Sequence, residues 1–317
     1  MIVSEDKTWL QMVFSYRSSI FPQTWRRIAF ATGLAIVVTF LEKTFNLSHF
    51  SLTVTPFTVI GIALGIFLGF RNNVCYSRFW EGRTLWGSLV NNTRSFIREL
   101  MMFLQESSPH ISSADRETRD GFIRHQTRRL IAYVHGLRHL LRDSDPFPEI
   151  SQYLSAEELE FLSIQKNVPL GILQRIGLHL RRAWLQGGLS DYHLVALEKT
   201  LAEITNVQGG CERIKNTPIP SVYTILIHRV VGFYCFFLPF GLVDTAGVLT
   251  PLVVLLVSHA FFGLDAIGGE IEQPFGMDKN DLPLHAISRT IEINLLQLID
   301  EQDLPEPVQA SPEGVLY

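Results

Sequence analysis

Charged residues are scarce in this chain. Asp, Glu, Lys and Arg make up 18% of its 317 residues, whereas apolar residues make up 47% and the mean hydropathy is +0.18. Soluble domains usually contain about 25% charged residues, so the composition favours a membrane protein. The net charge of −4 disfavours a nucleic-acid partner, because domains that bind nucleic acids are usually basic.

Cysteine and the common catalytic motifs are sparse as well. The three cysteines form no CxxC pair, so neither a disulfide framework nor a cysteine-based zinc site is expected. No GxGxxG, Walker, HExxH or GxSxG motif occurs. The first residues lack the pattern of a signal peptide. We expect them to stay cytoplasmic, with residues 9–14 forming an interfacial or packed segment.

Four apolar segments stand out, and they come in two pairs. They cover Ile28–Leu41, Pro56–Phe70, Val230–Val243 and Val248–Leu264. Each is shorter than the roughly 20 residues that a lone spanning helix needs, so buried helices of a soluble scaffold remain an alternative. Basic residues gather at the ends away from the short links, at Arg26, Arg27, Arg71, Arg213, Lys215 and Arg229. This asymmetry favours four spanning helices in the inner membrane, with both termini cytoplasmic.

Two stripes run along the second apolar segment. The smooth stripe consists of glycines that recur every four residues: Gly61, Gly65 and Gly69. Such spacing lets another helix backbone come close in a membrane. The bulky stripe beside it consists of Ile62, Ile66 and Phe70. Simple helix packing accounts for both stripes; in a ring of identical copies, the bulky stripe would face the axis and gate ions by dewetting.

The middle of the chain, about residues 77–218, is expected to be helical. Ser155 and Glu158 have the spacing of a capping box. Basic residues form one stripe on an amphipathic run: Arg124, Arg128, His135, His139 and Arg142. This stripe is either a solvated polar face or the wall of a vestibule that concentrates anions.

Two long blocks carry a family resemblance. The blocks Gly69–Phe96 and Leu238–Ile287 resemble the bestrophin family, especially its bacterial members. The resemblance implies an all-α integral membrane protein that assembles as a homopentamer around a central pore. Each subunit would have four transmembrane helices and a helical cytosolic domain, and the channel would conduct small monovalent ions, either Cl⁻ or Na⁺ and K⁺.

This organisation divides the chain into five parts. An N-terminal segment (1–25) precedes transmembrane helices 1 and 2 (26–75), the cytosolic vestibule domain (76–218), transmembrane helices 3 and 4 (219–270), and an acidic loop with the last helix and tail (271–317). In the family, the neck of the pore falls on Ile62, Ile66 and Phe70, and we assign a second, cytosolic constriction to Leu180. Arg71, directly after the neck, could reach toward the interface, pair with an acid or attract anions.

An acidic loop follows the last apolar segment. It offers oxygen ligands for a hard cation such as Ca²⁺, at Glu270, Glu272, Asp278, Asn280 and Asp281. Animal bestrophins carry a nearly unbroken acidic run here that helps to form a calcium clasp. Met277 and Lys279 interrupt the run in this chain, and a loop that holds the last helix is the alternative.

The function implied by the resemblance requires no cofactor. The rival interpretation is a membrane-bound, metal-dependent enzyme or regulator that uses the Glu270–Asp281 loop, with Glu272, Asp278 and Asp281 as metal ligands. The chain offers no convincing nucleophile or general base for such an enzyme.

Overall fold

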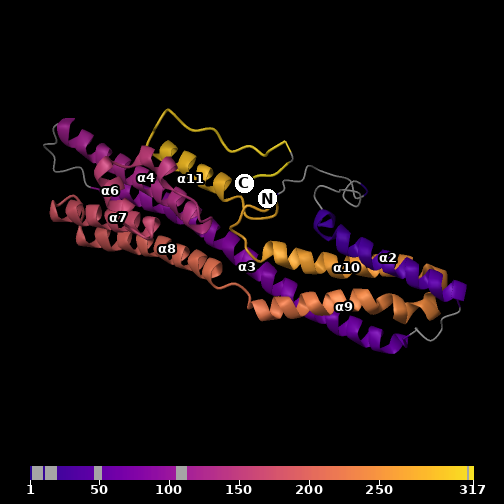
Figure 1. The fold of residues 1–317 in the computed structure, drawn as a ribbon. Coiled ribbons are helices and arrows are strands. Elements are labelled where there is room, and N and C mark those ends of the chain that lie inside the picture. The colour runs from indigo at the N-terminus through magenta and orange to yellow at the C-terminus, as the bar shows by residue number, and fades with distance from the viewer. Residues whose placement is uncertain (2–9, 11–19, 46–51, 105–112, 313) are drawn as a thin grey trace. The chain divides into compact units, whose positions relative to one another are not determined.

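The computed structural model describes residues 1, 10, 20–45, 52–104, 113–312 and 314–317. The N-terminal segment expected at residues 9–14 lies almost wholly outside the described residues. The described elements are helical (Figure 1): α2 (Phe21–Phe45), α3 (Val54–Phe103), α4 (Ser113–Leu141), α5 (Phe147–Ile150), η2 (Ser151–Tyr153), α6 (Ala156–Ser163), α7 (Val168–Leu185), α8 (Asp191–Asn216), α9 (Ser221–Ala246), η3 (Gly247–Leu249), α10 (Thr250–Ile271) and α11 (Leu284–Leu298).

The chain forms two compact units. The first, here called the membrane unit, comprises Ser4–Phe79 and Pro218–Gln273. The second, here called the α4 unit, comprises Met1–Val3, Trp80–Thr217 and Pro274–Tyr317. The long helix α3 contributes residues to both units.

Three apolar helical tracts of the membrane unit are long enough to cross a bilayer. They are Phe21–Phe45, the tract that begins α3, and Ser221–Ile271. The last tract contains α9, the 3₁₀ turn η3 and α10, and α9 packs against α10. It therefore folds back on itself, and α9 and α10, of 26 and 22 residues, are each long enough to cross a bilayer. Gly247 has a φ of +53°, a conformation that favours glycine, at the turn between the two helices.

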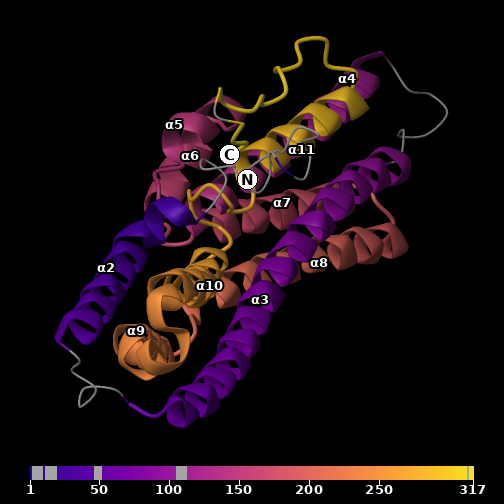
Figure 2. The same cartoon turned by 90° about the vertical axis from the view of Figure 1, so that its right-hand side faces the viewer.

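Helices α2, α9 and α10 form the closely packed core of the membrane unit. The N-terminal part of α3 lies on the far side of α9 and α10 from α2 (Figure 2). It attaches through one narrow row of buried residues: Phe57, Leu64, Leu68, Arg71 and Cys75. A Cβ added to Gly241 would lie 2.3 Å from the Phe57 ring, so this contact requires glycine. The backbone N–H of Leu52 donates to Phe240 O at 2.9 Å and fixes the start of α3 beside the end of α9.

The α4 unit is built around its central helix. Helix α4 packs against α7, α8 and α11, and its apolar face is fully buried at Leu130, Ile131, Tyr133 and Leu137. Helix α6 begins with the expected capping box: the Ser155 side chain accepts from the Glu158 N–H, and the Glu158 side chain accepts from the Ser155 N–H. That prediction from the sequence is confirmed.

Candidate functional site

The bulky apolar stripe lies on a free face of α3. Ile62, Ile66 and Phe70 are 63%, 53% and 64% exposed. At 100° per residue, this row lies about 180° around the helix from the buried row that includes Leu64 and Leu68. None of the described residues covers the row, and large apolar side chains in this position need either lipid or another protein surface beside them.

The three glycines of the stripe have different surroundings. A Cβ added to Gly61 would lie 2.6 Å from Tyr234 Oη, so Gly61 is needed for packing within the chain. A Cβ added to Gly65 or Gly69 would meet no atom within 4 Å. These two glycines therefore form a smooth flank that faces away from the subunit's own helices.

The opposite flank of α3 is bulky. Ile60, Phe67 and Val74 recur every seven residues there and are 44%, 55% and 51% exposed. The exposed row is thus bordered by glycines on one side and by large side chains on the other. A smooth flank and a bulky flank are complementary in shape. Because both belong to α3, the glycine flank of one copy can pack against the bulky flank of another copy.

Arg71 pairs with an acid, one of the three alternatives that its position leaves open. Its side chain is 1% exposed, and its Nη1 donates to Asp265 Oδ1 at 2.8 Å and to Asp265 O at 3.1 Å. Its Nη2 lies 3.7 Å from Glu272 Oε2. Asp265, also 1% exposed, accepts a hydrogen bond at 2.6 Å from His228 as well. Among the described residues, the charge of Arg71 is held inside the subunit and does not reach the exposed row.

Reasoning from the sequence missed Asp265. The signal was present, because Asp265 directly follows the apolar segment Val248–Leu264 on the same helix, and a charge at such a place is expected to have a partner. Asn72 adds to the same junction, since its Nδ2 donates to Leu264 O at 3.0 Å. A Cβ added to Gly268 would lie 2.4 Å from Asn72 Oδ1, so α10 approaches α3 closely here.

The acidic loop is closed by the buried carboxylate of Asp281. Asp281 is 3% exposed, and its Oδ2 accepts the Asp278 N–H at 2.7 Å, while the Asp281 N–H donates to Asp278 O at 3.1 Å. These two bonds close a turn. In the part of the chain that the structure describes, no group of three or more His, Cys, Asp or Glu side chains is arranged to hold a metal ion. Glu272 lies beside Arg71 in the membrane unit.

Leu180 is a core residue. Its side chain is 0% exposed, in the interior of the α4 unit, so within the subunit it packs in the core and presents no surface to a constriction. The sequence assignment of the cytosolic constriction to this side chain therefore does not fit the structure. On the same helix, Leu178 is apolar and 41% exposed.

The basic stripe of α4 is covered by acids at its centre, whereas Arg124 at its N-terminal end stays 53% exposed. His135 is 0% exposed, with Nδ1 3.1 Å from Glu149 Oε1 and Nε2 3.0 Å from Glu292 Oε2. His139 and Arg138 also contact Glu149. The Tyr153 hydroxyl donates to Glu292 Oε1 at 2.5 Å. This network ties α4 to α5, η2 and α11.

The network shifts its own pKa values. Burial by itself lowers the pKa of His135, but the hydrogen bonds and charges of Glu149 and Glu292 outweigh it, so the pKa is raised. Burial by itself would raise the pKa of both glutamates, but hydrogen bonds outweigh it. The pKa of Glu149 is lowered by hydrogen bonds from His135 and His139, and the pKa of Glu292 is lowered by hydrogen bonds from His135 and Tyr153. The His135 ring thus lies between two carboxylates that favour its protonated form.

Comparison with known proteins places this fold in one family. A family model described as bacterial/fungal bestrophin protein matches residues 1–297. A voltage-dependent anion channel-forming protein of Ralstonia nicotianae is 38% identical over 315 residues, which cover 98% of each chain. A protein of the same description from Escherichia coli K12 is 36% identical over 308 residues, or 97% of each chain.

Solved structures agree with this assignment. The crystal structure of a bacterial bestrophin homolog from Klebsiella pneumoniae superposes with a TM-score of 0.81 at 33% identity, covering 87% of this chain and 98% of that one. The expected all-α membrane architecture is therefore confirmed, and the rival assignment as an enzyme is not supported. The chain belongs to the bacterial and fungal bestrophin family, and it is accordingly an ion channel.

Proposed function

We propose that the protein assembles as a homopentamer in the inner membrane, and that Ile62, Ile66 and Phe70 of the five copies line the neck of its pore. The carrying observation is that this apolar row is exposed on the face of α3 opposite the row that attaches α3 to its own subunit. The count of five is the one that the bestrophin resemblance implies.

The flanks of α3 support contacts between identical copies. If the exposed row faces an axis, the smooth flank at Gly65 and Gly69 of one copy meets the bulky flank at Ile60, Phe67 and Val74 of the next. Small residues allow such close approach in a membrane, where packing rather than the hydrophobic effect drives association. Because the two flanks differ, each contact is head-to-tail, and a ring closes without unused surfaces.

The neck acts by partial dehydration. The exposed row and its continuation at Asn73 and Ser77 carry no charge, and Arg71 is neutralised by Asp265 inside the subunit. An uncharged apolar constriction passes monovalent ions when water enters it and blocks them when it dries. The sign of the permeant ion is then set by small differences in dehydration and by distant charges. The two relatives are named for anion channels, and reversal potentials in asymmetric KCl decide the question for this chain.

A second apolar constriction on α7 is formed by Leu178 in this proposal, because Leu178 has exposed surface and Leu180 has none. The channel needs no bound cofactor, and the turn between Asp278 and Asp281 is structural. Addition and chelation of Ca²⁺ during recordings test that point, since a current that depends on Ca²⁺ would contradict it.

The topology follows from the ends of the helices. Arg26 and Arg27 at the start of α2, Arg71 and Arg229 belong to one end of the membrane unit, and the two short links belong to the other. The positive-inside tendency then puts the basic ends and both termini in the cytoplasm.

Currents through purified protein in planar bilayers test the neck. Ile62→Ala is expected to raise single-channel conductance or to alter selectivity, because it widens the apolar ring. Ile36→Ala removes the same atoms from an exposed position of α2, 55% exposed, and is the matched control, with conductance expected to stay unchanged. Unchanged currents in Ile62→Ala, or equal changes in both variants, would contradict the proposal, as would a purified protein that consists of a single subunit.

A further inference from the structure

A cavity of the membrane unit lies between α2, α9 and α10. Its volume is about 620 Å³, within the usual range for sites that bind small molecules. Helix α2 provides Arg26, Arg27, Phe30 and Ala31; α9 provides His228, Gly232, Cys235 and Phe236; α10 provides Phe262 and Asp265. Neither the neck row of α3 nor its flanks line this cavity.

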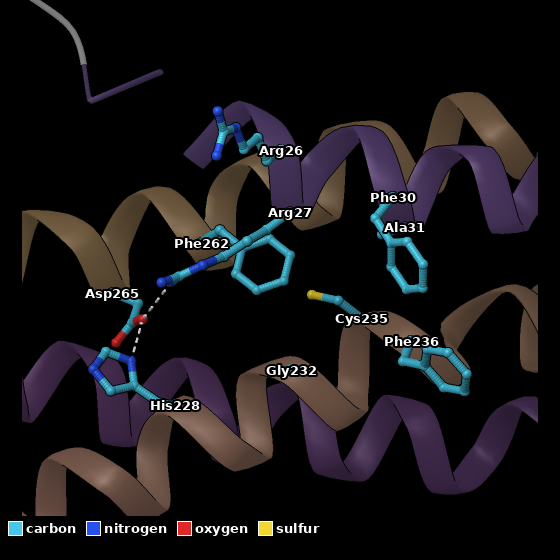
Figure 3. Close-up of a pocket in the computed structure, with 10 residues that line it drawn as sticks. All are labelled: Arg26, Arg27, Phe30, Ala31, His228, Gly232, Cys235, Phe236, Phe262 and Asp265. Carbon is cyan, nitrogen blue, oxygen red and sulfur yellow. Dashed lines mark hydrogen bonds and ion pairs between the residues drawn. The ribbon is translucent and has the colours of Figure 1, made fainter. Parts of the chain in front are cut away.

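The cavity has one polar end and one apolar end (Figure 3). Arg27, His228 and Asp265 lie toward one end, Phe30 and Phe236 lie at the other, and Arg26 extends upward from the same turn of α2 as Arg27. The two phenylalanine rings stack with their centroids 6.2 Å apart and close the apolar end. The polar end belongs to the first turns of α2, just before the apolar segment that begins at Ile28, so it falls where a spanning helix meets the headgroup region.

Positive charge exceeds negative charge at the polar end. Asp265 already pairs with buried Arg71, so little of its charge remains for Arg27, whose Nη1 lies 3.9 Å from Asp265 Oδ2. The side chain of Arg27 is 57% exposed. Arg26 forms no ion pair with any described residue, and its guanidinium rests over the Trp25 ring at 5.6 Å. Two arginines are therefore available to an anion at the mouth of an apolar cavity.

We propose that this cavity binds one anionic phospholipid of the cytoplasmic leaflet, with its phosphate held by Arg26 and Arg27 beside His228 and an acyl chain lying over Gly232 toward Phe30 and Phe236. A phospholipid matches the two ends of the cavity, since its anionic head suits the positively charged end and its acyl chain suits the apolar end. Arginine binds phosphate oxygens through two parallel N–H donors, which makes it well suited to this role.

The position of the cavity also agrees with a lipid. It opens between α2 and α9, while α2 and the pore-lining part of α3 lie on opposite sides of α9 and α10 (Figure 2). Trp25, 44% exposed beside the arginines, is the kind of aromatic residue that marks a membrane interface. A lipid in this place bridges α2 and α9 and completes the packing of the membrane unit.

Native mass spectrometry of the full-length protein tests the proposal, with phosphatidylglycerol and phosphatidylcholine of identical acyl chains as probes. The parent protein is expected to retain phosphatidylglycerol in preference to phosphatidylcholine. Each of Arg26→Gln and Arg27→Gln is expected to reduce that preference about fivefold. Arg229→Gln is the matched control, because Arg229 follows His228 directly but does not line the cavity, and its preference is expected to stay within about twofold of the parent.

A second variant tests the acyl chain. Gly232→Leu adds a side chain where a Cβ meets no atom within 4 Å, so the fold tolerates it while the cavity fills. Binding of both lipids at this site is expected to fall. Equal retention of the two lipids by the parent, or an equal loss in Arg229→Gln, would overturn the proposal. Displacement of phosphatidylglycerol by millimolar inorganic phosphate would also overturn it, because the site would then serve free anions. These measurements require no current, so they are independent of the proposed pore.

Discussion

The buried pair of Arg71 and Asp265 offers the sharpest test of the membrane unit. Both side chains are 1% exposed and joined at 2.8 Å, so Asp265→Asn leaves a buried guanidinium whose nearest described carboxylate, Glu272, is 3.7 Å away. Removing one partner of a buried ion pair costs about 3–5 kcal/mol, because the remaining charge is left without compensation. At about 2–4 °C for each kcal/mol, the melting temperature should fall on the order of 10 °C.

The double variant separates charge from packing. Replacing both partners with apolar residues, as in Arg71→Met with Asp265→Leu, should restore most of the lost stability, since a buried ion pair and an apolar pair of similar volume are often equivalent. Arg27→Gln is the control, because an exposed partner at 3.9 Å contributes about 1 kcal/mol or less. Thermal melts of the purified protein in detergent measure the stability of all four proteins. A double variant no more stable than Asp265→Asn would refute the reasoning.

Three further predictions concern other parts of the chain. Leu180→Ala should lower the free energy of unfolding by about 2–5 kcal/mol, because it leaves a cavity in the core. Leu178→Ala, at an exposed position, should change it by less than about 0.5 kcal/mol. Similar values for the two variants in denaturant titrations would contradict this. Gly241→Ala should cost about 1–3 kcal/mol, because its Cβ would clash with a ring at 2.3 Å, while Gly263→Ala meets open space and should leave the melting temperature unchanged. The raised pKa of His135 means that its imidazolium stabilises the fold fully below about pH 6.5, and that this contribution is lost as the pH rises through the raised pKa. His135→Gln should therefore flatten the alkaline decline in stability, and melts across a pH series that keep the parental slope would refute the assignment.

Local patterns in the sequence predicted much of the fold. The four apolar segments fall on α2, the start of α3, α9 and η3 with α10, and the capping box at Ser155 and Glu158 forms as expected. Both depend on residues a few positions apart, which a helix brings together without help from the rest of the chain. The two stripes of α3 likewise follow from helical geometry alone, although geometry does not say what surrounds the helix.

The errors and omissions all involve contacts between distant segments. Leu180 and Leu178 are both apolar and differ only in which side of α7 meets the core, and that choice depends on α4 and α8. His135 is buried by Glu149 and Glu292, the latter 157 positions away, so its own helix looks amphipathic with a polar outer face. The partner of Arg71 lies 194 positions away on α10. Periodicity reports the face on which a residue lies, and only the fold reports what covers that face.

The exposed row at Ile62, Ile66 and Phe70 has a consequence for biosynthesis. A subunit that leaves the insertion machinery alone meets only acyl chains, and a row without charge rests among them at no cost. A newly made subunit is therefore stable in the bilayer before it associates with other copies. Under the proposed assembly, the aqueous path exists only once the circle is complete, so incomplete intermediates do not leak and the cell keeps its ion gradients while the channel is being built.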